Sequence, residues 1–356
     1  MPKEITKVAV LIPAYEPDDR LPVYVKELRQ NGFIKILVVD DGSGEAYRPV
    51  FDAIDSETVV LRHEQNKGKG AALKTGFTYI DEEWKDVEGI LTADSDGQHA
   101  VKDCIKLAEE LSDKKRALYL GCRDFNLPNI PPKSRSGNKI TSFIFKALYG
   151  QKLPDTQTGL RAFGRDLIPF MLDIKGDRFE YETNMLIACI RKGVAIENIP
   201  IETIYEDNNS GTHFNPVLDS IKIYKVILGS FFKFMFVSLF SALLDQVLFN
   251  VINIGVFSNR KRKKGSFILI STIIARVFSS IVNYSMNRNL VFGNKENIKK
   301  TFIRYFVLCV TVMLLSALGT WALSIMGLSS TVAKLIVDTV LYFLSYRAQE
   351  RWVFAE

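Results

Sequence analysis

The sequence is poor in the residues that build disulfide frameworks and metal–thiolate sites. Its 356 residues include four cysteines, none of them in a C-x-x-C pair: Cys104, Cys122, Cys189 and Cys309. This spacing argues against a disulfide scaffold and a zinc site, and it fits a reducing compartment. Histidine is scarcer still, with three residues that do not cluster.

Several common signals are also missing. No G-x-G-x-x-G follows the first apolar run, and there is no G-x-x-x-x-G-K-[ST] loop, so we expect neither a dinucleotide-binding domain nor a P-loop. The first apolar run is about seven residues long and is followed by Glu16, Asp18 and Asp19, which argues against a signal peptide. No soluble basic face with aromatics is evident, so we expect no nucleic-acid partner.

Charge divides the chain into two parts. The formal net charge is +6, but the residues from Phe232 onward include 15 basic and 5 acidic side chains. The preceding residues therefore hold 31 basic and 35 acidic side chains. We expect an acidic soluble unit followed by a basic, apolar unit that suits an anionic membrane surface.

The first two hundred residues alternate between two patterns. Continuous apolar, β-branched runs predict buried strands at 7–13, 35–43, 58–63, 89–94 and 117–124. Helical spacing predicts helices between them at 21–31, 45–54, 70–83 and 101–113. This alternation predicts an α/β domain with a mostly parallel, Rossmann-like sheet and helices on both faces. Ligands bind such sheets at the carboxyl ends of the strands.

Polar clusters follow three of the predicted strands. They are Tyr15-Glu16, Asp40-Asp41 and the segment Asp94 to Gln98. Carboxylates gathered on one rim repel each other unless a cation or a donor-rich ligand lies there. Mg²⁺ or Mn²⁺ bridging a diphosphate is one such ligand, and an ordinary solvated turn is the simpler alternative. The Gly-rich segment 66–76 leads into a helix whose amides could face a phosphate, although a basic loop with a helix cap explains it equally well.

Five motifs carry a resemblance to a known family. "LIPAYEPDDRL", "VVDDGS", "NKGKGAALKTG", "DSDGQH" and "TGLRAF" occur in this order within residues 5–210. The chain resembles family-two glycosyltransferases of the GT-A fold, and most closely the subgroup like dolichol-phosphate mannose synthase. The resemblance implies a GT-A transferase domain over residues 1–212.

The same resemblance implies a donor site for a nucleotide-diphosphate sugar. The donor-binding positions would be Pro13, Tyr15, Glu16, Asp40, Asp41, Lys69 and Asp94. Asp94, Asp96 and Gln98 would hold the divalent metal as a DxD motif. Glu180 or Glu182 would line the sugar pocket, and the sequence does not choose between them.

A polyprenyl phosphate is the implied acceptor. Its phosphate would be bound by Arg123, Lys133, Ser134, Arg135 and Arg161, with Asp155 orienting the segment. Asp96, Arg123 and Arg135 would be the catalytic residues. Ile140, Phe143, Ile144, Ala147 and Leu148 lie on one face of a predicted helix, which the resemblance places at the membrane surface; a core-facing helix is the alternative. The resemblance also implies a single displacement with inversion.

The remaining residues predict an all-α membrane domain. Apolar segments run over about 232–257, 266–286, 303–326 and 329–349, each long enough to cross a hydrocarbon core of about 30 Å. Residues 213–231 precede them, with Asn215 and Pro216 as predicted N-cap and first helical residue of an interfacial helix.

This part also contains an internal repeat. "VNYSMNRNLVF" ends at Phe292 and "LSYRAQERWVF" ends at Phe354. The repeat resembles the GtrA-like four-helix domain, here residues 232–356. Aligning its two halves places Arg276 opposite Asp338, so we expect these two residues to pair or to share a polar cluster with Asp245.

Two functions from different classes stand at this point. The first is a membrane-bound glycosyltransferase that moves a sugar from a UDP- or GDP-sugar to an undecaprenyl or dolichyl phosphate. The second is a lipid-linked sugar transporter (flippase) or a scaffold whose transferase-like domain binds a sugar nucleotide without turnover. We expect a multi-pass plasma-membrane protein with a cytoplasmic transferase domain, and both a monomer and a homo-oligomer fit the sequence.

Overall fold

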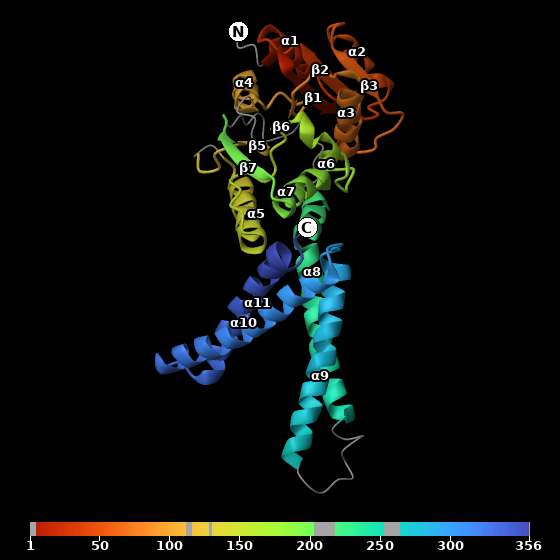
Figure 1. The fold of residues 1–356 in the computed structure, drawn as a ribbon. Helices are drawn as coiled ribbons and strands as arrows, with labels where there is room; N and C mark the ends of the chain where they lie inside the picture. Colours follow the sequence, from red (N-terminus) through yellow and green to blue (C-terminus); the bar gives the residue numbers. More distant parts are fainter. Residues whose placement is uncertain (1–4, 112–115, 128–129, 203–217, 253–263, 356) are drawn as a thin grey trace. The chain divides into compact units, whose positions relative to one another are not determined.

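The computed structural model describes residues 5–111, 116–127, 130–202, 218–252 and 264–355. The chain separates into two compact units, Met1–Ile227 and Leu228–Glu356 (Figure 1). The division falls inside one helix, α8 (Leu218–Asn250), so the predicted interfacial segment and the first predicted span form a continuous helix from residue 218. Asn215 and Pro216, the predicted start of the interfacial helix, lie outside the described residues.

The first unit is built on a mixed seven-stranded sheet. Its strands are β1 (Val8–Ala14), β2 (Lys35–Asp40), β3 (Val59–Arg62), β4 (Gly89–Thr92), β5 (Ala117–Cys122), β6 (Arg161–Gly164) and β7 (Ala195–Pro200). The spatial order is β3-β2-β1-β4-β6-β5-β7. Among the described strands, β6 alone is antiparallel to its neighbours, β4 and β5, so the sheet is mostly parallel as predicted.

The predicted strands are confirmed, but two further strands were not predicted. β6 has four residues and lies within the "TGLRAF" motif, where a single short apolar stretch gives little period-2 signal. β7 is an edge strand with one buried residue, Ile196, and its sequence AIENIP is interrupted by Glu197 and Asn198. Insertion of β6 between β4 and β5 brings residues near Arg161 beside the strand that leads to Asp94.

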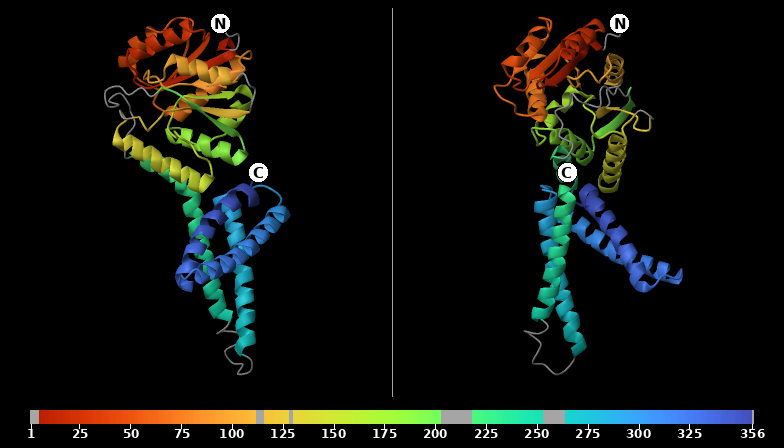
Figure 2. Two further views of the ribbon diagram at one scale, coloured as in Figure 1. Left: turned by 90° about the vertical axis from the view of Figure 1, so that its left-hand side faces the viewer. Right: turned by 180° about the vertical axis from the view of Figure 1, so that it is seen from behind.

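Helices cover both faces of this sheet (Figures 1 and 2). One apolar core joins β1, β2, β4 and β5 to α1 (Arg20–Gln30), α2 (Arg48–Asp52) and α4 (Val101–Glu110). On the other face, α3 (Lys69–Glu83) packs on β1 and β2 and contacts α6 (Ile168–Leu172) and α7 (Glu180–Lys192). Short 3₁₀ turns occur at Ile5–Lys7, Glu45–Tyr47 and Arg165–Leu167. The α/β prediction is therefore confirmed.

The helix α5 (Pro132–Tyr149) has a buried side and an exposed side. Leu148 and Tyr149 are buried, and the Tyr149 hydroxyl donates to the Ile227 carbonyl at 2.7 Å. Ile140 and Phe143 are 54% and 70% exposed. The predicted single apolar face is therefore divided: part of it packs within the first unit and part of it is unburied.

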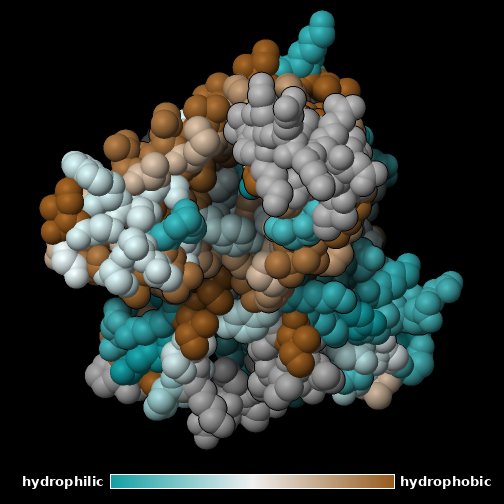
Figure 3. Space-filling model, turned by 90° about the horizontal axis from the view of Figure 1, so that it is seen from below, coloured by the Kyte–Doolittle hydropathy of each residue, from teal (hydrophilic) through white to brown (hydrophobic). Residues whose placement is uncertain are grey.

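Among the described residues, the second unit contains four long helices. They are the greater part of α8, then α9 (Lys264–Met286), α10 (Ile298–Ile325) and α11 (Ser330–Ala348). Among the described residues, Ile221–Asn250 and Ile298–Ile325 are long and apolar enough to cross a membrane. Many of their apolar side chains are exposed, and brown apolar surface is prominent in Figure 3.

The internal repeat is visible as a local two-fold arrangement. α9 and α11 each end in a π-helical turn, Asn287–Val291 and Gln349–Val353. The Asn287 amide donates to Gln349 Oε1 at 3.1 Å, and the rings of Phe292 and Phe354 stack with centroids 5.2 Å apart. Each of these four residues thus contacts its counterpart in the other half. The sequence repeat therefore corresponds to a structural one.

The expected ion pair between Arg276 and Asp338 is wrong. Arg276 Nη2 lies 3.2 Å from Asp245 Oδ2, which links α9 to α8. Asp338 instead pairs with Lys334, one turn earlier on α11, at 2.9 Å. Each aspartate therefore pairs with a basic residue of its own helical hairpin, and not with the equivalent position of the other repeat. The alternative expectation, one polar cluster of Arg276, Asp338 and Asp245, is also wrong, because Arg276 pairs with Asp245 while Asp338 pairs with Lys334.

Candidate active site

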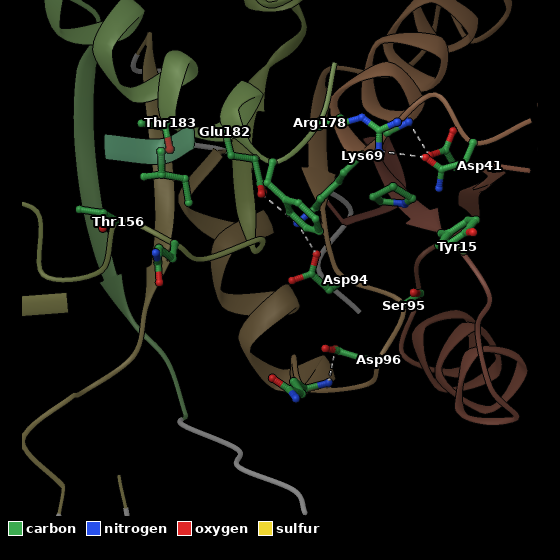
Figure 4. A pocket seen from close by; sticks show the side chains of 18 of the residues that line it. Tyr15, Asp41, Lys69, Asp94, Ser95, Asp96, Thr156, Arg178, Glu182 and Thr183 are labelled. Carbon is green, nitrogen blue, oxygen red and sulfur yellow. Dashed lines mark hydrogen bonds and ion pairs between the residues drawn. The ribbon is translucent and has the colours of Figure 1, made fainter. Parts of the chain in front are cut away.

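A cavity of about 390 Å³ lies at the carboxyl ends of β1, β2 and β4 (Figure 4). Loops after three parallel strands meet there because parallel strands end at the same edge of the sheet. Residues from these loops, from the segments after β3 and β5 and before β6, and from the starts of α3, α7 and α8 line it: Pro13, Ala14, Tyr15, Asp41, Asn66, Gly68, Lys69, Asp94, Ser95, Asp96, Gln98, Arg123, Thr156, Gln157, Arg178, Phe179, Glu182, Thr183 and Ile223. Most of the predicted donor residues are therefore gathered in one cavity.

The two carboxylates after β2 have different positions. Asp41 lines the cavity and is almost fully buried, and its oxygens accept hydrogen bonds from the Lys67 and Gly68 amides at 2.9 and 2.7 Å. His63 Nδ1 lies 2.7 Å from the same carboxylate. Asp40 instead accepts from the Ser43 amide and does not line the cavity. Asp41 therefore fixes the loop that leads into α3.

The segment after β1 is held in an unusual backbone conformation. Glu16 has φ 49°, the left-handed region that non-glycine residues rarely adopt. Its amide donates to Ser43 Oγ at 2.8 Å, which ties this segment to the loop after β2. Pro13 and Tyr15 line the cavity, whereas Glu16 does not. Strain of this kind is common at ligand-binding sites.

A half-buried lysine joins two carboxylates from different elements. Lys69 Nζ lies 2.7 Å from Asp94 Oδ1 and 3.0 Å from Glu182 Oε2 (Figure 4). Burial opposes the charged form of Lys69, but the charges of the two carboxylates outweigh it and raise the lysine pKa. Burial likewise disfavours the charged form of Asp94, yet Lys69 and His99 lower its pKa below the usual range. The site therefore holds a fixed cation beside the DxD segment.

The contact between Lys69 and Glu182 depends on two glycines at the start of α3. A Cβ at Gly68, whose φ is +106°, would lie 2.4 Å from the Asp177 carbonyl oxygen. A Cβ at Gly70 would lie 2.5 Å from Tyr181 Cβ. The absence of both side chains lets the start of α7 lie against the start of α3. The Gly-rich segment found in the sequence thus allows two helices to pack closely, in addition to forming a loop.

Asp94 is enclosed on several sides. His99 Nε2 lies 3.3 Å from Asp94 Oδ2, so N–H groups of Lys69 and His99 approach both of its oxygens. A Cβ at Gly159 would lie 2.3 Å from Asp94 Oδ2. His99 is buried, and no role was predicted for it from the sequence. This enclosure leaves Asp94 less open to a metal ion than Asp96.

The residues at the DxD segment fit a divalent cation in their chemistry. Asp96 and Gln98 line the cavity with Asp94 and supply the carboxylate and amide oxygens that Mg²⁺ and Mn²⁺ prefer. Burial, and then the charge of Asp94, raise the pKa of Asp96, and a bound cation would relieve that repulsion. The described part of the chain contains no group of three or more His, Cys, Asp or Glu side chains arranged to hold a metal. A metal bound here would also need oxygen atoms from a bound substrate.

Arg123 lines the cavity and is paired with a fully buried carboxylate. Its Nε and Nη2 donate to the two oxygens of Asp155 at 2.7 and 3.2 Å. The guanidinium also lies over the Phe125 ring, 5.3 Å from its centroid. The side chain is 22% exposed, so one edge of it reaches the cavity. Asp155 therefore orients this arginine.

The other predicted acceptor residues do not line this cavity. Arg135 Nη2 donates to the Leu127 carbonyl at 2.8 Å, and its buried Nε has no hydrogen-bond partner among the described residues. Ser134 is half-buried near the start of α5. The side chain of Lys133 lies outside the described part of the structure.

The position of Arg161 differs from the expectation that this residue binds the acceptor phosphate. It is 1% exposed, and its guanidinium donates to the Thr158 and Glu182 carbonyls at 2.9 and 2.7 Å. A side chain enclosed in this way cannot reach a lipid phosphate. Arg161 instead supports Glu182, whose Oε1 lies 3.9 Å away, and so continues the row of alternating charges that includes Lys69.

The structure separates the two glutamates that the sequence left as alternatives. Glu182 is buried and lines the cavity. Glu180 accepts hydrogen bonds from the Asp177 and Arg178 amides at the start of α7 and does not line it. Helical spacing explains this result, because side chains two residues apart on a helix point in different directions.

Several lining residues were not predicted. The most informative is Arg178, just before α7, which adds a third basic side chain to Lys69 and Arg123 and lies 3.4 Å from Asn66 Oδ1 (Figure 4). Thr156 and Gln157 lie beside the predicted Asp155. The loop that contains Arg178 has no motif of its own, so only its packing against α3 could reveal it.

Comparisons with known proteins agree with this arrangement. Residues 9–169 match the family described as Glycosyl transferase family 2, and residues 233–354 match the GtrA/DPMS transmembrane domain. The chain is 31% identical over 235 residues to an uncharacterized protein of Methanocaldococcus jannaschii, covering 64% of this chain and 95% of that protein.

Two named relatives are similar over the same region. One is the UDP-N-acetylglucosamine–dolichyl-phosphate N-acetylglucosaminyltransferase of Methanococcus voltae, 27% identical, with 62% of this chain and 95% of that protein covered. The other is the dolichyl-phosphate beta-glucosyltransferase of Saccharomyces cerevisiae, 29% identical, with 61% and 72% covered. Together with the apolar helices, the GtrA/DPMS match identifies a membrane protein. The chain therefore belongs to glycosyl transferase family 2, is a glycosyltransferase, and carries a GtrA/DPMS transmembrane domain in its C-terminal part.

Proposed function

We propose that the protein transfers a sugar from a nucleotide-diphosphate sugar to a polyprenyl phosphate in the membrane. The observation that carries this proposal is the cavity at the carboxyl ends of β1, β2 and β4, which three basic side chains line: Lys69, Arg123 and Arg178. A site for two phosphate-bearing substrates needs such a concentration of positive charge. The relatives named for transfer to dolichyl phosphate support this acceptor class.

The donor would lie over the loops after β1 and β2. Pro13, Tyr15 and Asp41 line that part of the cavity and are placed for the nucleoside. The diphosphate would extend toward Lys69 and the DxD segment. A UDP- or GDP-sugar fits this proposal, and the sugar would lie near Glu182 at the start of α7.

A divalent metal would be held by Asp96 and Gln98, with Asp94 beside them. Bound there, Mg²⁺ or Mn²⁺ would neutralise charge on the departing nucleoside diphosphate. Lys69 holds a positive charge next to the same position whether or not a metal is bound, because Asp94 and Glu182 stabilise it. Arg178 extends that positive region on the side of α7.

The acceptor phosphate would be bound by Arg123, which Asp155 orients with two hydrogen bonds. Arg135 on α5 would reach it only by turning its guanidinium away from the Leu127 carbonyl. A lipid monophosphate is already anionic at neutral pH, so its oxygen needs no strong general base. As that oxygen bonds to the anomeric carbon, the bond from this carbon to the diphosphate breaks, which gives inversion. The protein contributes by holding two anions close together.

In the cell, the transferase unit would face the cytoplasm, where nucleotide sugars are available, and α8 to α11 would cross the plasma membrane. A second candidate is a lipid-linked sugar transporter or scaffold that binds the nucleotide sugar without turnover. The presence of Lys69, Asp96 and Arg123 together in one cavity favours turnover, because nucleotide binding alone needs no acceptor arginine.

The test is incubation of membranes that contain the protein with a panel of labelled UDP- and GDP-sugars and polyprenyl phosphate. We expect label in the lipid extract with at least one donor, and none with the Asp96→Ala variant. Donor binding by the purified protein without lipid labelling for any donor would contradict transfer and support the scaffold.

A further inference from the structure

His63 is a buried titratable side chain that the proposed reaction does not use. It follows β3 directly, and its side chain is 5% exposed. Its ring nitrogens contact two other elements: Nδ1 lies 2.7 Å from Asp41 Oδ1 after β2, and Nε2 lies 2.9 Å from Thr75 Oγ1 on α3. An ionised carboxylate can only accept hydrogen bonds, so Nδ1 donates to Asp41. Asp41 lines the cavity (Figure 4), whereas His63 and Thr75 are not among its described lining residues.

Asp41 holds the loop that joins β3 to α3. The Lys67 and Gly68 amides donate to its two oxygens at 2.9 and 2.7 Å. Asn66, Gly68 and Lys69, from this loop and the first position of α3, line the cavity. The position of the Asp41 carboxylate therefore sets where these three lining residues lie.

Of the three described groups that donate to Asp41, His63 is the one fixed to the sheet. Its amide donates to the Asp40 carbonyl at 2.9 Å, which continues the pairing of β2 with β3. The two loop amides belong to the segment that Asp41 has to hold, so they cannot fix its position by themselves. On its other side the imidazole contacts Thr75, in the second turn of α3. His63 thus joins Asp41 to the end of β3 and to α3.

We propose that His63 is a positioning residue for the nucleotide donor, which acts through Asp41 on the loop 64–68 and on Lys69. The proposal rests on the proposed function, because the donor is the ligand whose affinity His63 changes. Lys69 supplies the positive charge beside the DxD segment, and the loop before it sets its place. Without the bond from His63 to Asp41, the loop has more freedom in the free protein, and this freedom is lost when the diphosphate binds.

The test separates the two ring nitrogens with side-chain amides. In His63→Asn the amide nitrogen takes the place of Nδ1 and donates to Asp41, whereas in His63→Gln it takes the place of Nε2 and reaches Thr75. Each variant keeps one of the two hydrogen bonds, so a purely structural role predicts equal effects. Binding of UDP and of GDP to the purified full chain is measured by calorimetry with Mn²⁺ present.

We expect His63→Asn to bind the preferred nucleotide as the wild-type protein does. For His63→Gln we expect the dissociation constant to rise about tenfold, which corresponds to about 1.4 kcal/mol. In steady-state transfer the donor KM should rise by the same factor, with kcat and the acceptor KM changed by less than about twofold, because ground-state binding is what is lost. Thermal unfolding should be affected equally in the two variants.

Two further changes serve as controls. Thr75→Val removes the second contact of the ring and should raise the donor KM about threefold, and Thr75→Ser should restore it. Asp103→Asn alters another buried carboxylate of the same unit, which accepts from the Glu202 amide at 3.0 Å and is not among the described lining residues. This change should lower stability and leave donor affinity unchanged.

The outcomes separate this proposal from the proposed function. Equal donor affinities of His63→Asn and His63→Gln would overturn the positioning role, and lipid labelling by the wild-type protein would then leave the proposed function intact. If the wild-type protein binds neither UDP nor GDP and labels no lipid, both proposals fail. If His63→Gln does not fold, the threonine pair decides: a donor KM that is unchanged in Thr75→Val would overturn the positioning role.

Discussion

At the scale of single residues, the two aspartates of the DxD segment have different surroundings. Asp94 is approached by Lys69 Nζ at 2.7 Å and by His99 Nε2 at 3.3 Å. Asp96 accepts from the Gln98 amide at 3.0 Å and has no basic side chain at that range among the described ion pairs. We infer that Asp96 contributes more to metal binding and Asp94 more to the position of Lys69.

The first prediction tests this division. Asp96→Ala should weaken Mn²⁺ binding and abolish transfer, whereas Asp94→Asn should keep more of the Mn²⁺ affinity and lose stability, because Lys69 loses a charged partner. Mn²⁺ binding is measured by electron paramagnetic resonance, and stability by thermal unfolding of the purified protein. Equal loss of Mn²⁺ binding in both variants would show that the two aspartates act as equivalent ligands.

The second prediction concerns Arg123. Because Asp155 is fully buried, Arg123→Ala leaves a carboxylate without its partner and should destabilise the transferase unit by about 3 kcal/mol. Arg123→Ala combined with Asp155→Asn should recover most of the stability but not the transfer activity. Unfolding and lipid labelling are measured on the same preparations. Recovery of activity in the double variant would mean that Arg123 serves only to neutralise Asp155.

At the scale of elements, the site depends on how closely the start of α3 meets the start of α7. Lys69 belongs to the first helix and Glu182 to the second, and they are 3.0 Å apart. The Ala71 amide donates to the Asp177 carbonyl at 2.9 Å, which fixes the same contact through the backbone. Gly70 lies between these two interactions and has no room for a side chain.

The third prediction is that Gly70→Ala damages the site without touching a charged residue. Its Cβ would lie 2.5 Å from Tyr181 Cβ, so the helices must separate at a cost of about 1–3 kcal/mol. Weaker donor binding should accompany this loss, because Lys69 and Glu182 move apart. Nucleotide affinity is measured by calorimetry beside thermal unfolding.

Gly137→Ala on α5 is the matched control. No atom lies within 4 Å of a Cβ at that position, so the change should stabilise the helix slightly, by up to about 1 kcal/mol. A Gly70→Ala protein as stable as Gly137→Ala would show that α7 can shift freely relative to α3.

At the scale of the whole molecule, a buried hydrogen bond joins the two halves of the helical unit. It links the repeat-equivalent residues Asn287 and Gln349, which are both buried and lie 3.1 Å apart. Their neighbours Tyr284 and Tyr346 lie against Phe354 and Phe292, each with ring centroids 5.9 Å apart. The two halves therefore exchange equivalent contacts about a local axis.

The fourth prediction follows from this exchange. Asn287→Ala should lower the stability of the helical unit by about 1–3 kcal/mol, because Gln349 loses its partner inside the protein. Gln349→Ala should have a similar effect, and the double variant should cost less than the sum of the two. Thermal unfolding in detergent measures these effects, with the exposed Asn289→Ala as control. Strict additivity would show that the two amides act independently.

The sequence by itself determined the parts of the protein that local patterns encode. Apolar runs and helical spacing are local properties, so the five strands, the intervening helices and the four long apolar helices were predictable. Motif order was sufficient to propose the family, and the 62-residue offset between Phe292 and Phe354 was sufficient to find the repeat. The rule that parallel strands end at one edge was sufficient to expect Asp41, Asp94 and Asp96 close together.

Only the tertiary structure decided which side chains meet. Arg161 and Glu180 carry the same charges as the residues that line the cavity, yet burial removes one from it and the helical turn directs the other away. Arg178 lines the cavity because α7 packs on α3, and no sequence motif predicts this contact. Arg276 pairs with Asp245 and Lys334 with Asp338, because ion pairs form between side chains that packing brings within about 4 Å, and sequence symmetry does not set that distance.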